Sequence, residues 1–185
     1  MAFLIHCDAG VLVRMSSCQK YMDGLRRMPV RCVKREERRT KMSVVDLSRF
    51  YPKHERYYDL ALREIRSGVK RSCWMWYIFP QIQGLGISET SVQYAISSKE
   101  EAAAFLADPC LGKHLVEISE ALLQLKTNNP REVFKQDAMK LHSSMTLFLC
   151  VSDPYGVFQQ VLDKFFGGRY DYKTLDILKA KEESK

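Results

Sequence analysis

Residues 70–81 (Lys-Arg-Ser-Cys-Trp-Met-Trp-Tyr-Ile-Phe-Pro-Gln) combine cations with aromatic rings, and both tryptophans of the chain lie among them. An arginine can hold a carboxylate or phosphate through two parallel hydrogen bonds, and an indole ring can stack on a planar group. The candidate contacts to such a ligand are Lys70, Arg71, Ser72, Trp74, Trp76 and Gln81. The alternative interpretation is that the large side chains of this segment fill the core.

A second group of polar side chains lies in residues 140–148, within an otherwise apolar segment. Its candidate ligand contacts are Lys140, Ser143, Ser144 and Thr146. Serine and threonine are poor choices for the interior of an exposed helix. Their hydroxyls can bond to carbonyls one turn earlier, or they can face a ligand. The ligand hypothesis predicts a pocket for a small anionic or nucleotide-like molecule between the 70–86 segment and the 140–146 helix.

The common catalytic and metal-binding signatures are missing from the sequence. Gly84-Leu85-Gly86 is too short for a phosphate-binding loop, and the four histidines lack metal-ligand spacing. We therefore expect neither a metal nor a cofactor. A hydrolase or transferase acting on the same ligand is an alternative function, with His142 and Asp171 as candidate acid/base groups. A protein-interaction module is a third.

The net charge of +7 is concentrated at the N-terminus. Residues 1–42 contain ten basic and four acidic residues, whereas residues 43–185 contain 19 basic and 18 acidic residues. We therefore do not expect residues 43–185 to bind nucleic acid. Residues 1–42 are interpreted as a disordered or non-native extension, with a mitochondrial presequence and a weak nucleic-acid-binding arm as alternatives.

Cysteine spacing and hydropathy indicate the cellular environment. No two of the six cysteines form a CxxC pair, which is typical of incidental thiols in a reducing compartment. No apolar run approaches the roughly 20 residues of a membrane span, so membrane insertion is not expected. We predict a cytoplasmic protein.

The elements that must position these side chains are helices. Pro52 fits the first turn of a helix ending near Ser67, and Ser98 with Glu101 forms a capping box for a helix ending near Ala107. Three Asx-Pro pairs predict further helix starts at Asp108, Asn129 and Asp153.

Other signals extend this helical pattern over the body of the chain. Asp137 predicts the cap of a helix, Gly167 the end of another, and residues 172–178 a last short helix. Residues 73–79 are expected to form a buried helical turn or an extended segment. The fold predicted is an all-α, compact orthogonal multi-helix bundle in one domain at 43–180, followed by a charged tail at 181–185.

Several motifs resemble the domain of unknown function 1810 family over about residues 43–180. They are Asp46–Phe50, the 70–86 segment, residues 140–148, Phe165–Gly168 and Thr174-Leu175. The resemblance implies a mostly or wholly helical single domain that excludes residues 1–42. It implies no activity, because the family has none established.

The chain departs from the family's pattern at two positions. Cys73 stands where histidine is frequent, and His142 stands where arginine is frequent. If the family uses that histidine as an acid/base or that arginine to bind an anion, this chain lacks the group. Both departures count against strong catalysis in this chain.

Overall fold

The computed structural model describes residues 45–183, so the predictions for residues 1–42 lie outside the described part. The helices are α2 (Tyr51–Arg66), α3 (Met75–Ile78), α4 (Glu89–Gln93), α5 (Lys99–Ala107), α6 (Leu111–Leu123), α7 (Pro130–Phe134), α8 (Ala138–Leu149), α9 (Val157–Phe166) and α10 (Tyr172–Glu183). Within the described range there is no strand, only one isolated parallel bridge between Ile82 and Ile96. The predicted all-α single domain is confirmed.

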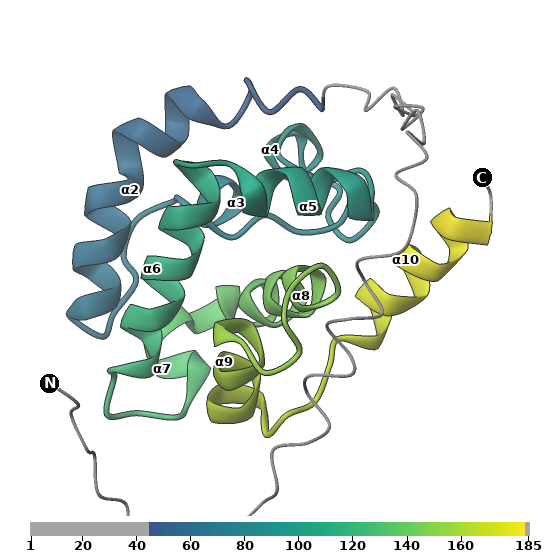
Figure 1. Cartoon of the computed structure of the whole chain (residues 1–185). Coiled ribbons are helices and arrows are strands. Elements are labelled where there is room, and N and C mark those ends of the chain that lie inside the picture. The colour runs from purple at the N-terminus through teal and green to yellow at the C-terminus, as the bar shows by residue number, and fades with distance from the viewer. Residues whose placement is uncertain (1–44, 184–185) are drawn as a thin grey trace, which may run out of the picture. The chain divides into compact units, whose positions relative to one another are not determined.

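Helix α8 is the centre of the fold. It packs against α5, α7, α9 and α10, while α2 packs on α6 and α3 on α2 (Figure 1). All residues from Leu141 to Phe148 are buried, including the serines and the threonine. A helix that is buried on every side can carry hydroxyls only if they find partners within the protein.

Two of the predicted helix starts have the expected geometry. The Ser98 hydroxyl accepts a hydrogen bond from Glu101 N at 3.3 Å. The Asn129 side chain accepts one from Arg131 N at 3.0 Å, with Pro130 as the first helical residue. These caps use only neighbouring residues, so the sequence predicts them well.

Three other starts differ from the prediction. Asp108 accepts hydrogen bonds from Cys110 N and Leu111 N, but α6 begins only at Leu111. Asp153 accepts from Tyr155 N in a turn, and α9 begins after Gly156. Asp137 precedes α8 without capping it, because its carboxylate pairs with two lysines instead. A tertiary ion pair has displaced the local cap.

Other elements confirm or extend the predicted ones. Residues 75–78 form the buried helical turn α3, and Gly167 ends α9 at a φ of 61°. Helix α10 continues to Glu183, beyond the predicted end at 178 and into the proposed charged tail. The short helix α4, capped by Ser88, was not predicted. Over residues 45–183, no helix has the length and hydrophobicity needed to cross a bilayer.

The C-terminal end of α6 is closed by a side chain of α9. Lys164 Nζ donates hydrogen bonds to the carbonyl oxygens of Leu122 at 3.2 Å and Leu123 at 2.7 Å, and also to that of Leu125. The last carbonyls of a helix have no partner within it, and this ammonium bonds to two carbonyls of the last turn of α6 and to one just beyond it.

Gly112 is required where α5 meets the start of α6. A Cβ at this position would lie 1.9 Å from Leu106 O, a backbone atom that cannot move independently.

Gly112→Ala should therefore lower the free energy of unfolding by at least about 2 kcal/mol, which chemical denaturation measures. Gly167→Ala is the matched control: it meets no atom within 4 Å but has a φ of 61°, so only the left-handed conformation costs, about 1 kcal/mol. Equal losses would contradict the steric explanation.

Candidate ligand-binding site

The loop that precedes α3 is organised around one buried carboxylate, Glu64 on α2. Its oxygens accept hydrogen bonds from Arg71 N at 2.8 Å, Ser72 N at 3.1 Å and Trp74 Nε1 at 2.8 Å, and also from the Ser72 hydroxyl. Burial alone would raise the pKa of Glu64, but these donors hold the pKa below its ordinary value. The loop does bind an anion, and that anion belongs to the protein.

This contact decides what the predicted residues of the loop can do. The Trp74 ring is fully buried, and the Ser72 hydroxyl already has a partner. The Arg71 side chain is exposed. The Trp76 side chain, in α3, is only partly buried. Trp76 and Arg71 are therefore the members of this group that remain accessible.

A charged cluster joins the two predicted segments. Asp137 pairs with Lys70 at 2.6 Å and with Lys140 at 2.7 Å. Lys70 Nζ lies 5.1 Å from the ring centroid of Trp74, and Lys140 Nζ lies 4.6 Å from that of Trp76. Burial raises the pKa of Asp137, but both ammonium groups more than offset this and leave it lowered. Lys70 with Trp74 and Trp76, from the first segment, therefore lies close to Lys140, from the second, and Asp137 bridges the two lysines.

The hydroxyls of α8 have mostly internal partners. Thr146 Oγ1 lies 2.9 Å from His142 O, and Ser143 Oγ lies 3.0 Å from Met139 O and 2.7 Å from Asp171 Oδ2. These contacts agree with back-bonding to the preceding turn. Ser144 is fully buried, and its hydroxyl has no partner within the described part of the chain.

The two candidate acid/base residues hold the junction between α8 and α10. Asp171 accepts hydrogen bonds from Thr174 Oγ1 and Ser143 Oγ, both at 2.7 Å. His142 is nearly buried, stacks on Phe166 and places Nε2 2.7 Å from Arg169 O. The roles of His142 and Asp171 in an acid/base reaction stay predictions.

An aromatic groove of about 560 Å³ is lined by Trp76 and other residues in and around α2, α3 and α4. Its lining consists of Lys53, Tyr57, Cys73, Trp76, Tyr77, Glu89, Thr90, Gln93 and Tyr94. This volume falls in the range of small-molecule sites. We define these nine residues as the aromatic groove.

Rings and charges are arranged together along the α2 wall of this groove. Lys53 Nζ and the Arg56 guanidinium lie 5.8 Å and 5.4 Å from the Tyr57 ring centroid. The Tyr57 and Tyr77 rings are 5.6 Å apart. Glu89 adds a carboxylate at the start of α4. The groove thus offers flat apolar faces, a cation and an acceptor for a donor group.

Much of this groove was not predicted from the sequence, and neither was the role of Glu64, which fixes the loop before α3. Lys53 and Tyr57 are four residues apart on α2, so helical spacing was a usable signal for them. Glu64 gave no signal, because nothing local distinguishes it from other glutamates on a helix surface. Residues of α4 were missed together with their helix. Gln81, in contrast, was predicted but contributes only its carbonyl, to Ile96 N at 2.8 Å.

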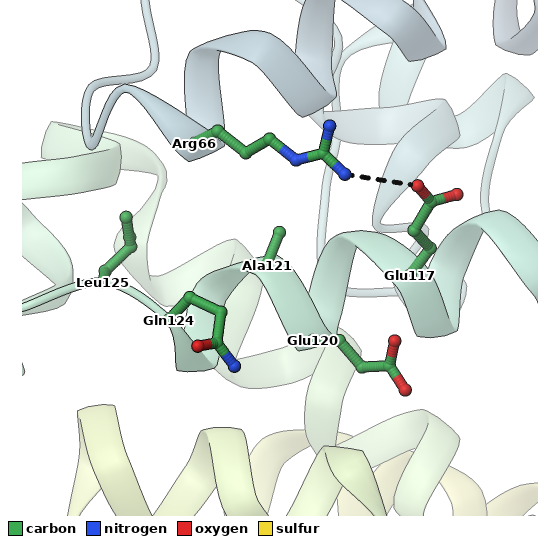
Figure 2. A pocket seen from close by; sticks show the side chains of 6 residues that line it. All are labelled: Arg66, Glu117, Glu120, Ala121, Gln124 and Leu125. Atoms are coloured by element: carbon green, nitrogen blue, oxygen red, sulfur yellow. Dashed lines mark hydrogen bonds and ion pairs between the residues drawn. The ribbon is translucent and has the colours of Figure 1, made fainter.

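Two other hollows have different chemistry. Figure 2 shows one of about 360 Å³ in which Arg66 points at Glu117, with Glu120 on the same helix. The two charges form an exposed ion pair of 3.4 Å, and the carboxylates of Glu117 and Glu120 make this hollow less suited to an anion. A second hollow contains Arg131 and Lys135 beside Met139 and no aromatic ring. Within residues 45–183, no group of three His, Cys, Asp or Glu could hold a metal ion.

Glu64→Gln tests the organisation of the loop. The amide offers one acceptor oxygen and places an NH₂ group against the remaining donors, so we expect a loss of at least about 2 kcal/mol of unfolding free energy by denaturation. Because folding lowers the pKa of Glu64, its contribution is complete above the pKa of an unfolded glutamate and disappears as the pH falls through the folded value. The variant should therefore lose less stability in acid. Glu120→Gln, on the exposed face of α6, should change neither quantity.

Asp137→Ala tests the charged cluster. Only 8% of the Lys70 side chain is exposed, so the substitution leaves a buried ammonium without its carboxylate. The expected loss is about 3 kcal/mol, measured by denaturation. Lys140→Ala, which removes a partly exposed partner, should cost less than about 1 kcal/mol. Similar losses in both variants would show that the burial of Lys70 is not the cause.

Comparison with known proteins places this helical domain. It is similar to the crystal structure of the conserved hypothetical protein Rv1873 from Mycobacterium tuberculosis, with 41% sequence identity and a TM-score of 0.70 over 72% of this chain and 96% of that one. No curated protein matches the chain. The family model described as "Protein of unknown function (DUF1810)" matches residues 44–178, which include the charged cluster and the aromatic groove. The chain therefore belongs to the DUF1810 family.

Proposed function

We propose that the protein binds a small planar anion of the nucleotide type in the aromatic groove. The observation that carries this proposal is the placement of a partly exposed tryptophan, Trp76, in one hollow with Lys53 and three tyrosines. A stacked base gains attraction from every ring face it covers, and an ammonium favours a charged substituent beside it.

The Trp76 ring is also in contact with a cation of α8. The Lys140 ammonium lies 4.6 Å from its ring centroid and is itself fixed by Asp137 at 2.7 Å. A cation near an indole is attracted to its negative face. Lys140 therefore supports the proposal as a positioning residue, and so do Lys70 and Asp137 behind it.

The groove also offers polar groups that have no hydrogen-bond partner among the described residues. Within residues 45–183, the Thr90 hydroxyl and the Gln93 amide form no hydrogen bond, and both line the groove. Glu89 can accept a hydrogen bond from an amino group. Lys53 suits a phosphate or carboxylate. This set matches a ring that carries an amino group and an anion.

The groove is preferred over a pocket between residues 70–86 and 140–146, which stays a prediction. Ser72 and Trp74 are engaged by Glu64, and Ser143 and Thr146 bond to their own helix. Binding there would require these contacts to break. Binding in the groove requires no such change.

Three probes separate the parts of the proposed ligand. Adenosine monophosphate has a ring and a charge, adenosine has the ring alone, and inorganic phosphate has the charge alone. We expect the monophosphate, at millimolar concentration, to raise the melting temperature of the full chain by roughly 3 °C and the other two to have smaller effects. Tryptophan fluorescence should change with the same concentration dependence, since Trp76 lines the groove.

Variants locate the site. Trp76→Ala and Lys53→Ala should each weaken monophosphate binding at least about tenfold, measured by calorimetry. Arg131→Ala removes a cation from a different hollow and should leave affinity unchanged. A loss of binding in Arg131→Ala alone, or no binding of any of the three probes by the intact protein, would contradict the proposal.

A further inference from the structure

Two histidines meet inside the contact between α2 and α6, and the proposed ligand site uses neither. His54 is completely buried, and its Nε2 lies 3.0 Å from His114 Nδ1. The two rings are nearly parallel. Tyr58 stacks on His114 with ring centroids 3.7 Å apart. A pair of identical titratable groups at hydrogen-bond distance requires an explanation of where the protons are.

The hydrogen bonds determine the tautomers of both rings. His54 Nδ1 lies 3.1 Å from Tyr77 O, and a carbonyl can only accept, so Nδ1 of His54 carries a proton. In the neutral ring Nε2 is then an acceptor. His114 must donate to it from Nδ1, which leaves His114 Nε2 with the lone pair. The chain of donors runs from His114 to His54 to the Tyr77 carbonyl.

This series of hydrogen bonds can take up one proton and stay intact, but a second proton breaks the contact between the two rings. A proton added at His114 Nε2 leaves its Nδ1 donor in place, so the contact to His54 persists. A second proton must go to His54 Nε2, the acceptor of that contact. Two N–H groups on two imidazolium rings would then oppose each other at a spacing of 3.0 Å.

Burial disfavours a proton on the fully buried His54 more than on the partly exposed His114. The charged or titratable groups near the pair are Glu55, Tyr58 and Asp59 on α2, Tyr77 on α3, and Asp108, Cys110, Lys113 and Glu117 at or before α6. Burial lowers the pKa of His54 to about 4, the His114 charge adds to this, and the Tyr77 carbonyl and Asp108 oppose it. Burial also lowers the pKa of His114, with Glu117 and Asp59 opposing and Lys113 adding.

We infer that His54 and His114 form a pH-sensitive latch between α2 and α6, which one proton leaves closed and a second proton opens. The latch adjoins the aromatic groove, because His54 lies next to Lys53 and holds the carbonyl of Tyr77, two residues that line the groove. A second proton on His54 Nε2 removes the contact with His114 and leaves the Nδ1–H bond to Tyr77 O in place, so opening separates α2 from α6 beside the groove. The inference itself does not depend on a ligand.

Imidazole nitrogen chemical shifts, followed by NMR in the ¹⁵N-labelled full chain during a pH titration, test the latch. Near pH 7 both rings should be in the Nδ1–H form. As the pH falls, His114 should be protonated first, and His54 only near pH 4. An Nε2–H tautomer at His54, or one shared midpoint near the ordinary value for histidine, would overturn the inference.

A variant provides a second readout that does not depend on resolving these signals. His114→Asn keeps an N–H donor at the position of Nδ1 but cannot become charged. Because folding lowers both pKa values, stability is complete above the ordinary histidine pKa and is lost as the pH falls through the folded values. The fall in melting temperature between about pH 7 and pH 4.5 should be smaller in His114→Asn than in the wild type, by roughly 3 °C.

Comparing the fall in melting temperature, rather than its absolute value, removes any uniform destabilisation by the variant. The matched control is His142→Gln, which removes a histidine outside the contact between α2 and α6. A reduction of the fall as large as that in His114→Asn would show that the effect is not specific to this contact and would overturn the latch. An equal fall in the wild type and His114→Asn would overturn the latch.

Discussion

The buried carboxylate of Glu64 is the contact on which the arrangement around α3 depends. It accepts hydrogen bonds from two backbone amides, one hydroxyl and one indole, all supplied by residues 71–74. A carboxylate in the interior is unfavourable unless several donors surround it. Once they do, the loop has one conformation, Trp74 is fixed in the core, and the chain enters α3 with Trp76 directed to the groove.

The cations of the two conspicuous segments follow the same logic. Lys70 and Lys140 look in the sequence like a basic edge that awaits an anion. In the fold they share Asp137, and each lies near a tryptophan ring. Their charges therefore help to position aromatic side chains. Recognition of a ligand is then left to residues that the internal network does not occupy, which are those of the aromatic groove.

Features that depend on neighbouring residues could be predicted from the sequence, whereas features that depend on distant residues could not. Caps at Ser98 and Asn129, the glycine end of α9 and the helical class of the fold depend on neighbouring residues, and the structure confirms them. The failed cap at Asp137 has a different cause, since Lys70 lies 67 positions away and outcompetes the local amides. Glu64 was missed for another reason: its donors are close in sequence, but nothing distinguishes it from other glutamates on a helix surface. The groove needed knowledge of how α2, α3 and α4 pack, which spacing within one helix cannot give.

The closure of α6 by Lys164 has a consequence for the chemistry of that amine. Its ammonium group donates hydrogen bonds to the carbonyl oxygens of Leu122, Leu123 and Leu125. An acylating reagent needs a neutral amine with a free lone pair, and the bonds to these carbonyls require the protonated form. Lys164 is thus protected from acylation while α9 stays packed on α6, and it becomes reactive when the two helices separate. The rate of its acylation therefore reports the opening of this helix contact.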